Sequence, residues 1–360
     1  MIELTLPAVI EAAHPFIARL HASRPNAPSP HDALLWGEDA SGTVYASQHG
    51  LVAIDGLSAA ELDGDIVLVQ PDGGRIERLL RAKSPHNTLL VTERCDQLCV
   101  MCSQPPKKTH VDRFALFEMA CLLAEPGSVI GISGGEPTLY KEALLAMIER
   151  VLAQRAELAF HVLTNAQHFD ADDVERLRAP LFRQVLWGVP LYASDPALHD
   201  DVVGKAGAFA RLQESFAHLL MAGARVELRT VLMTSNLTCL PELARHVTRR
   251  LRFVHAWSIM QLENIGFARN RWPQLYVDHS QDFTPIASAL NEAKLRGVPA
   301  RLFNFPRCTV PEPYRHLAAA SISDWKRKYV SACSTCSERD ACTGFFEWHP
   351  EAATQGVHPL

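Results

Sequence analysis

The chain has 360 residues, of which 48% are hydrophobic and 21% charged, and its formal net charge is -5. This length predicts two to three domains whose cores need no disulfide staples, and the charge balance argues against nucleic-acid binding over the whole surface. No run of about 18 uncharged apolar residues occurs and the N-terminus lacks the basic start of a secretory signal, so we expect a cytoplasmic protein without a membrane span.

Residues 1–86 predict a small, mostly β module with a helical start. Short β-forming runs alternate there with Gly and Asp turns, and the sequence PDGG between two of the runs is a hairpin signal. The expected strands are Thr43–Ser47, Gly50–Ile54, Asp65–Gln70 and Arg75–Leu80.

Residues 87–280 show apolar strands that alternate with longer amphipathic helices. Six such units predict an α/β fold of parallel strands joined by crossover helices, in an open or partial (β/α)6 barrel. The loops that carry chemistry then lie at the carboxyl edge of the strands. The expected strands are Thr88–Thr92, Ser128–Ser133, Leu158–Thr164, Gln184–Leu191, Arg225–Met233 and Phe253–Gln261, and the expected helices are Arg113–Ala124, 138–154, Asp172–Leu177, 206–222 and 241–251.

Residues 281–360 break this alternation. We expect one helix at 283–296, a short strand at Ala300–Phe303 and a helix near 322–330, followed by a segment with little periodicity. Such a segment usually needs an internal cross-link, which cysteines can supply. Seven of the nine cysteines of the chain fall into two groups, so we expect two metal centres.

The first group follows the first strand of the barrel as Cys95-x3-Cys99-x2-Cys102. Three thiolates on one loop can hold three irons of a four-iron cube and leave the fourth iron open to a small molecule. The alternatives are a zinc site that lacks one ligand, or three thiols of the core. A loop that also holds Asp, Gln and Ser is a poor place for apolar thiols, which favours the cluster.

A second motif, Gly-Gly-Glu-Pro, ends the next strand. Gly134 and Gly135 let the backbone turn sharply and approach a ligand, because no Cβ stands in the way. Glu136 is an anionic acceptor that suits an ammonium group, and Pro137 can open the next helix. Alone, this would be an ordinary strand-to-helix turn, but its position one unit after the cysteines strengthens both assignments.

The two motifs resemble those of radical S-adenosylmethionine (radical SAM) enzymes. Cys95, Cys99 and Cys102 match the cluster motif of that superfamily, and residues 134–137 match its SAM-ammonium motif. The resemblance implies a [4Fe-4S] cluster whose open iron chelates SAM. With an electron from an external donor, SAM then yields methionine and a 5′-deoxyadenosyl radical, which removes a hydrogen atom from substrate. Met101 replaces the aromatic residue that usually precedes the third cysteine, and its sulfur can still cover the adenine.

Other superfamily positions match less closely. Asn165 ends the third strand, where a polar side chain commonly meets the SAM ribose or carboxylate, but it could equally cap a turn. Arg229 on the fifth strand is a candidate partner for a carboxylate, with a structural role as the alternative. The segment LENIGFAR after the sixth strand resembles the backbone turn that reads adenine in related enzymes.

The second cysteine group comprises Cys308 and the run Cys333-x2-Cys336-x5-Cys342. Four thiolates suit a closed auxiliary [4Fe-4S] cluster or a structural zinc ion. This tail resembles the shortened auxiliary-cluster extensions called SPASM or twitch domains in radical SAM maturases, which favours one iron–sulfur cluster.

Taken with LENIGFAR and the tail, the string HNTLLVTERCDQLCVMCSQPPK resembles the radical SAM maturases of His-Xaa-Ser peptide systems, of the HxsC type, from about His86 to Cys342. The resemblance implies a precursor peptide as substrate and a companion radical SAM maturase. We expect the N-terminal module to dock the precursor by strand addition at a sheet edge. The alternatives are radical chemistry on a small molecule, or a metal-stapled scaffold or electron carrier without turnover. The reaction on the peptide stays open between a side-chain crosslink, an epimerisation and an oxidation.

Overall fold

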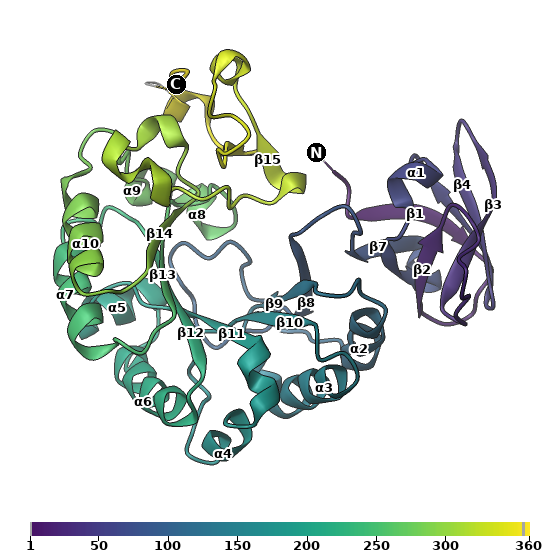
Figure 1. The fold of residues 1–360 in the computed structure, drawn as a ribbon, viewed down its shortest axis with the longest axis horizontal. Coiled ribbons are helices and arrows are strands. Elements are labelled where there is room, and N and C mark those ends of the chain that lie inside the picture. The colour runs from purple at the N-terminus through teal and green to yellow at the C-terminus, as the bar shows by residue number, and fades with distance from the viewer. Residues whose placement is uncertain (1, 355–356) are drawn as a thin grey trace.

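The computed structural model describes residues 2–354 and 357–360, which form a closed seven-stranded barrel, a seven-stranded parallel sheet and a two-stranded pair. The closed barrel lies at the N-terminal side of the molecule (Figure 1), with its strands in the order β1-β5-β4-β3-β2-β6-β7. Its strands are β1 (Thr5–Ile10), β2 (Phe16–His21), β3 (Asp32–Asp39), β4 (Gly42–Ser47), β5 (Gly50–Asp55), β6 (Ile66–Gln70) and β7 (Arg75–Leu80).

Strand β1 stands where we expected a helical start, so that prediction is wrong. The residues of β1 alternate between exposed and buried, which is the period of a strand, and Pro7 is unfavourable in the interior of a helix. The hairpin prediction for PDGG is confirmed, since β6 and β7 pair antiparallel across it. Because the barrel is closed, it offers no free sheet edge, which argues against docking of a peptide by strand addition.

The parallel sheet runs in the order β14-β13-β12-β11-β10-β9-β8, and every neighbouring pair is parallel. The longer helices lie on its convex face (Figure 1), so the expected α/β fold is confirmed. The strands are β8 (Asn87–Thr92), β9 (Val129–Gly134), β10 (Ala159–Leu163), β11 (Val185–Pro190), β12 (Arg225–Val231), β13 (Ala256–Met260) and β14 (Ala300–Phe303). The helices are α2 (Phe114–Leu122), α3 (Lys141–Gln154), α4 (Asp173–Leu177), α5 (Pro196–Val203), α6 (Ala208–Ala222), α7 (Leu240–Arg250), α8 (Phe267–Asn270), α9 (Trp272–Leu275) and α10 (Thr284–Leu295).

Strand β14 adds a seventh strand to the six that we expected in the sheet. It pairs with β13, and α10 connects the two strands. The sheet therefore extends past residue 280, which we had taken as the end of the barrel. The run Ala300–Phe303 is too short to signal by itself which sheet it joins. None of the helices in the described part of the chain is long and apolar enough to cross a membrane.

The two large units share one apolar core. Ile17, Leu68 and Leu80 of the closed barrel belong to the same buried cluster as α2 and the parallel sheet, and the Arg113 guanidinium lies 3.1 Å from the Glu77 carboxylate across the junction. A second cluster, which includes Leu6 and Tyr45, fills the closed barrel itself. The closed barrel is thus packed against the sheet domain.

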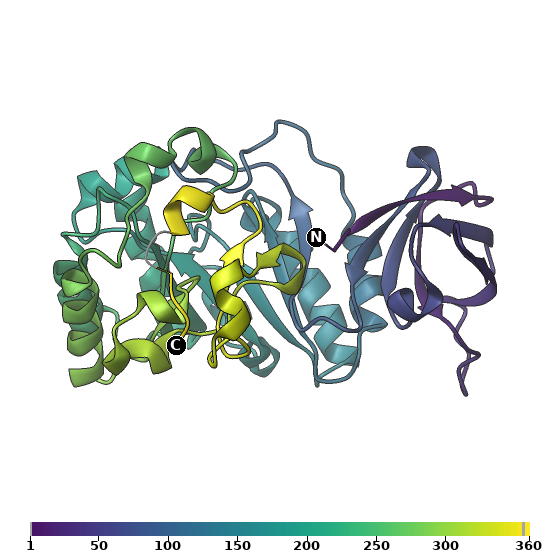
Figure 2. The same ribbon diagram turned by 90° about the horizontal axis from the view of Figure 1, so that it is seen from above.

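The cysteine-rich tail contains only short elements within its described residues. These are 3₁₀ turns and the two-residue strands β15 (Arg327–Lys328) and β16 (Phe345–Phe346). The helix expected near 322–330 is wrong, because a turn at Asp324–Lys326 passes directly into β15. Pairing with β16 and side-chain contacts to the sheet domain replace helical hydrogen bonds there. Figure 2 shows the tail lying across the sheet domain rather than beside the N-terminal barrel.

Candidate functional site

The first group of cysteines lies on the loop after β8, at the carboxyl edge of the sheet. Cys95, Cys99 and Cys102 are half-buried free thiols. The loop is held at both its middle and its end by backbone hydrogen bonds to the α5 terminus and to the segment after β13. These bonds are Leu98 N to Val203 O (3.0 Å), Val100 N to Val202 O (2.9 Å) and Phe267 N to Cys102 O (2.8 Å).

Two glycines allow this close packing. Gly204 has φ +63°, and a Cβ there would lie 2.7 Å from the carbonyl oxygen of Leu98. Gly266 has φ +58°, and a Cβ there would lie 2.3 Å from the carbonyl oxygen of Cys102. Both the backbone conformation and the close approach therefore require glycine. Gly266 belongs to the LENIGFAR segment, which thus packs directly against the cysteine loop.

The Gly-Gly-Glu-Pro turn contacts the same loop through its backbone. The amide of Gly135 donates to Thr92 O over 2.8 Å, and the amide of Glu136 donates to Arg94 O over 2.7 Å. A Cβ on Gly135 would lie 2.2 Å from Arg94 O. The structure therefore brings the two predicted motifs together. Pro137 opens a 3₁₀ turn, Pro137–Tyr140, that runs directly into α3.

The three thiols are poor acids as they stand. Burial raises the pKa of Cys99 to about 12 and that of Cys95 to about 11, and charges on neighbouring groups, including the other thiols of the loop, add to the rise. Burial also raises the pKa of Cys102. A cationic centre would lower these pKa values, since metal binding releases thiol protons.

Glu136 is fully buried, and its carboxylate is already engaged by the protein. Its Oε1 accepts from the amide of Thr138 (2.8 Å) and from the Thr164 hydroxyl (2.6 Å), and its Oε2 accepts from the amide of Asn165. Burial raises the pKa of this carboxyl, although these hydrogen bonds act in the opposite direction. Glu136 therefore joins the end of β10 to the turn after β9, and its contact with an ammonium group stays a prediction.

Asn165 joins β10 to the cysteine loop. Its amide nitrogen donates to Asp96 Oδ1 over 2.8 Å, and its oxygen accepts from the amide of Gln167 over 3.0 Å, as a turn cap does. Lys205 donates to the second Asp96 oxygen, and His168 lies 3.4 Å from that oxygen. Although burial acts in the opposite direction, these hydrogen bonds hold the pKa of Asp96 well below its ordinary value. Both side-chain atoms of Asn165 are thus engaged by the protein.

Arg229 projects from β12 on the concave face of the sheet. Its Nη1 lies 3.0 Å from Oε2 of the buried Glu227, which His161 approaches to 2.7 Å from β10. Burial alone would raise the pKa of Glu227, yet the contacts with His161 and Arg229 bring it down to about 2. Gly188 lies between these strands, and a Cβ there would lie about 3 Å from both side chains. Arg229 thus has a protein carboxylate as partner and stands 21% exposed.

Met101 is buried in an apolar cluster with Tyr192, Met233 and Leu262. Tyr192 was not among the site residues predicted from the sequence. Burial raises the pKa of the Tyr192 phenol well above its ordinary value, and the charges of Cys99 and Cys102 add to the rise. Tyr192 therefore lies beside the cysteine loop. An aromatic residue directly after a parallel strand was the signal that could have found it.

The four cysteines of the tail line one cavity together with Pro306, Tyr329 and Phe345. Burial raises the pKa of Cys308 and Cys333, and the charges of the neighbouring thiols add to the rise. Backbone amides point at two of the sulfurs, as they do at many metal-bound thiolates. These contacts are Arg307 N to Cys342 Sγ (3.3 Å), Gly344 N to Cys342 Sγ (3.4 Å) and Leu360 N to Cys336 Sγ (3.4 Å).

No three His, Cys, Asp or Glu side chains of the described residues stand close enough together to hold a single metal ion. The donor chemistry fits an iron–sulfur cluster at both places, since thiolates are its usual ligands. At the first place, the charges of Cys95 and Cys102 raise the pKa of Cys99, so the three thiols lie near one another. Beside them is the turn at Gly135, where a Cβ would collide with the backbone of the cysteine loop. At the second place, four thiols surround a cavity with amide donors.

Comparison with known families assigns the sheet domain. Residues 89–247 match the family model described as the radical SAM superfamily. The chain contains a radical SAM domain. This domain spans β8 to α7 and includes the three-cysteine loop and the Gly-Gly-Glu-Pro turn. The match confirms the superfamily that the two motifs indicated. No curated protein matches the chain.

Several solved structures are similar to the chain at low sequence identity. SuiB of Streptococcus suis, bound to the precursor peptide SuiA, is 15% identical with a TM-score of 0.47, and the match covers 60% of this chain and 48% of SuiB. A radical SAM methyltransferase from Sphaerobacter thermophilus is 18% identical with a TM-score of 0.44, and the match covers 76% of each chain. The chain thus spans about half the length of SuiB.

Proposed function

We propose that this chain is a radical SAM maturase that modifies a ribosomally synthesised peptide. The observation that carries the radical chemistry is the backbone contact between the three-cysteine loop and the Gly135–Glu136 turn at the carboxyl edge of the sheet. The peptide substrate rests on the resemblance of the cysteine-loop string and the tail to maturases of the HxsC type. A precursor of the His-Xaa-Ser kind and a companion maturase follow from the same resemblance.

Each residue of the site has its own role in this proposal. Cys95, Cys99 and Cys102 would hold a [4Fe-4S] cluster, and the turn from Gly134 to Glu136 would receive the ammonium group of SAM. When bound, the cluster and SAM supply a 5′-deoxyadenosyl radical, using one electron from an external donor. Arg229 would pair with a carboxylate through the part of its guanidinium that Glu227 leaves exposed.

Two further residues would shield the site at the cysteine loop and the Gly-Gly-Glu-Pro turn from water. Met101 and Tyr192 are both almost fully buried beside the cysteine loop. A radical that removes hydrogen atoms needs a site from which competing molecules are excluded. The apolar cluster that these two side chains share with Leu262 meets that need.

The tail would bind an auxiliary [4Fe-4S] cluster through Cys308, Cys333, Cys336 and Cys342. The three amide-to-sulfur contacts support bound thiolates, and the sparse regular structure of the tail supports a metal that fixes its fold. Iron content and acid-labile sulfide, measured after reconstitution, distinguish this cluster from a zinc ion.

The division into a module at 1–86, a barrel from 87 and a tail to 360 is part of the same proposal, with the end of the barrel moved to Phe303 because β14 joins the sheet. The N-terminal module would dock the precursor by its outer surface. Deleting the module is a poor test, since Ile17, Leu68 and Leu80 pack in the core of the sheet domain. Substitution of the exposed Trp36 by Ser is the better test of precursor affinity.

The experiment that tests the function is anaerobic incubation of the reconstituted protein with SAM and dithionite. A radical SAM enzyme releases 5′-deoxyadenosine, whereas a metal-stapled scaffold or an electron carrier releases none. Addition of the candidate precursor, followed by mass measurement of the peptide, then tests the substrate. An epimerised peptide keeps its mass in H₂O but takes up a solvent hydrogen, so an unchanged peptide mass in both H₂O and D₂O, together with SAM cleavage, would favour radical chemistry on a small molecule.

A further inference from the structure

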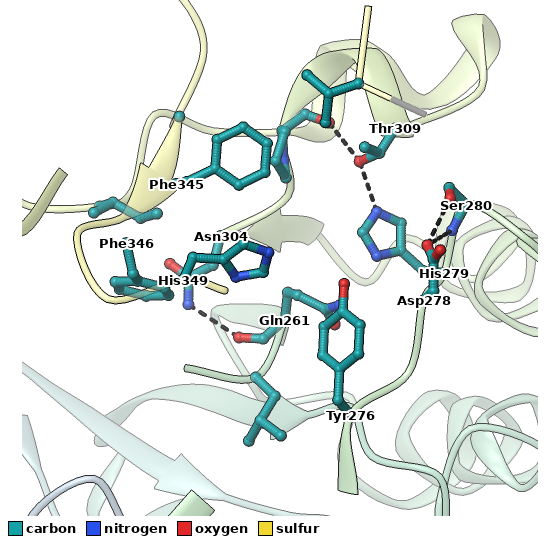
Figure 3. A pocket seen from close by; sticks show the side chains of 15 residues that line it. Gln261, Tyr276, Asp278, His279, Ser280, Asn304, Thr309, Phe345, Phe346 and His349 are labelled. Carbon is teal, nitrogen blue, oxygen red and sulfur yellow. Dashed lines mark hydrogen bonds between the residues drawn. The ribbon is translucent and has the colours of Figure 1, made fainter. Parts of the chain in front are cut away.

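A pocket with several polar side chains in its lining lies where residues that follow β13 meet the tail (Figure 3). Gln261 and Leu262 enter it directly after β13, and Phe345 enters it from the tail. Leu262 packs in the same apolar cluster as Met101 of the cysteine loop. On the opposite side, Phe345 also lines the cavity of the four tail cysteines. The pocket therefore separates the two cysteine sites and borders both.

The protons around His279 can be assigned from its neighbours. His279 is 3% exposed, and its Nε2 lies 2.7 Å from the Thr309 hydroxyl oxygen. That hydroxyl donates its only hydrogen to Pro306 O over 2.7 Å, so Nε2 must be the donor in the contact with Thr309. Burial lowers the pKa of His279 to about 4, so the ring is neutral at pH 7. Its Nδ1 is therefore an acceptor, and it has no hydrogen-bond partner among the described residues.

Gln261 supplies a second acceptor to the same pocket. It is 5% exposed, and its side-chain nitrogen donates to Val277 O over 2.7 Å, which fixes the orientation of the amide. Its Oε1 has no partner among the described residues. The Tyr276 hydroxyl lines the pocket too, and its single proton can serve one of the two acceptors at most. Gln261 Oε1 and His279 Nδ1 are therefore two buried acceptors without a hydrogen-bond partner among the described residues, although buried acceptors normally have one.

The residues that line the pocket indicate which kind of hydrogen-bond donor it would bind. Tyr276, Phe345 and Phe346 present aromatic surfaces, which attract cations, and Asp278 contributes a carboxylate. None of the described lining residues is Lys or Arg. The free space is about 20 Å³, which is enough for one water molecule or one ammonium group. The aromatic surfaces, the Asp278 carboxylate and the two acceptors favour a small cation with N–H donors over an anion.

We propose that this pocket binds a primary ammonium group of the substrate and thereby selects a peptide side chain that carries an amine. The proposal rests on the proposed function, since it takes the space between the two cysteine sites as the place where substrate is held. Gln261 and His279 act as the two acceptors, and Asp278 supplies the compensating charge.

The test is calorimetric titration of the reconstituted protein with methylammonium chloride, with tetramethylammonium chloride as the control of equal charge and no N–H donor. Methylammonium should bind, and tetramethylammonium should not. Gln261→Leu should weaken methylammonium binding about tenfold, because one acceptor is lost. His246→Phe is the matched control, since His246 is a half-buried histidine on α7, away from the pocket, and this change should leave binding as in the wild type.

Tyr276→Phe is a second variant, and its expected effect is a gain of binding, which a failure to fold could not produce. It removes the local hydroxyl that competes for the acceptors, so methylammonium should bind more tightly, and weaker binding would contradict the proposal. The proposal is also overturned if methylammonium gives no heat, which means that water fills the pocket, or if Gln261→Leu binds it unchanged.

Two further measurements separate this proposal from the proposed function. Displacement of methylammonium by SAM alone would assign the pocket to the cofactor and overturn the substrate assignment. Release of 5′-deoxyadenosine is measured on the same wild-type sample. SAM cleavage without methylammonium binding refutes the pocket alone, and methylammonium binding without SAM cleavage refutes the radical function alone.

Discussion

The two cysteine regions of this chain are built in opposite ways. The loop with Cys95, Cys99 and Cys102 lies at the carboxyl edge of a seven-stranded sheet and is hydrogen-bonded to the turn after β9, to α5 and to the segment after β13. The tail has only 3₁₀ turns and one pair of two-residue strands among its described residues. The comparison teaches that the first region is shaped by the fold and would persist without metal, whereas the second depends on what its thiols bind.

The electrostatics of the two regions differ as well. Glu227, inside the sheet domain, has a pKa lowered to about 2, because the contacts with His161 and Arg229 outweigh the effect of burial. Glu263 lies where the tail meets the sheet domain. Burial raises its pKa, and Lys326, at 3.4 Å, offsets this only in part. The surroundings of Glu227 therefore favour its ionised form, and the surroundings of Glu263 favour its protonated form.

Removal of one cysteine from each region gives the largest expected contrast. Cys99→Ala should reduce release of 5′-deoxyadenosine to background while leaving the far-UV circular dichroism and the amide exchange of the apo-protein unchanged, because backbone contacts hold that loop. Cys336→Ala should lose the tail metal and most of the exchange protection in residues 322–349, with the first cluster still loadable. Cys239→Ala, outside both groups, is the control. An apo-tail that stays as protected as the holo-tail would refute the comparison.

Acidification should weaken the sheet domain through Glu227. Its pKa is about 2 in the folded protein and about 4.5 when unfolded, so its contribution is complete above pH 4.5 and is lost as the pH falls toward 2. The difference corresponds to about 3 kcal/mol. The free energy of unfolding of the apo-protein, measured in urea between pH 3 and 7, should fall with acid, and Glu227→Gln should flatten that slope.

The contact between Glu263 and Lys326 of the tail serves as the internal comparison for this experiment. Glu263 has a raised pKa in the folded protein, so its contribution is present below the unfolded pKa of about 4.5 and is lost as the pH rises through the folded value. Protection of residues 322–328, corrected for intrinsic exchange, should therefore not decrease from pH 7 to pH 5. A loss of protection in residues 322–328 over this pH range would contradict the raised pKa of Glu263.

Features that depend on a short stretch of chain were predictable from the sequence. The three cysteines and the Gly-Gly-Glu-Pro turn each follow a strongly apolar strand, so their meeting at one edge follows from parallel topology alone. Residues that act across long separations were not predictable. Lys205 contacts Asp96 across 109 positions, and Tyr192 shares an apolar cluster with Met101 of the cysteine loop although it follows β11, three strands away from β8 in the sheet.

The wrong predictions have a related physical cause. The stretch at 322–330 contains residues that a helix accepts, but Asp324 bonds to Arg81 and Ser84, about 240 positions earlier in the chain. Those contacts and the pairing of β15 with β16 fix an extended path. Local pattern could not reveal them, because their partners lie before the first strand of the parallel sheet.

Glu136→Gln tests whether the turn is a structural joint or a direct ligand. The backbone amides of Thr138 and Asn165 face different oxygens of Glu136, so either orientation of a glutamine leaves one amide facing an NH₂ group. The free energy of unfolding of the apo-protein should therefore fall by about 2 kcal/mol. Chemical denaturation measures this fall, and calorimetry measures SAM affinity separately. Unchanged stability with weakened SAM binding would instead favour direct contact of Glu136 with the ammonium group.

The smallest expected effect concerns the contact between the tail and the segment that joins β7 to β8. Asp324 accepts two hydrogen bonds from the buried Arg81 and one of 3.1 Å from Ser84. Asp324→Asn keeps the shape of the side chain but removes its charge, and this should destabilise docking of the tail by about 1 kcal/mol, because Asp324 is partly exposed. Amide exchange in residues 322–328 should then accelerate about fivefold in the EX2 regime, with the sheet unaffected.

Glu338→Gln is the matched control, since its partner Arg307 lies within the tail, and it should leave exchange in residues 322–328 unchanged. Equal acceleration in both variants would mean that the tail loosens as a whole rather than at its docking contact, and the metal would then be what holds it to the sheet domain.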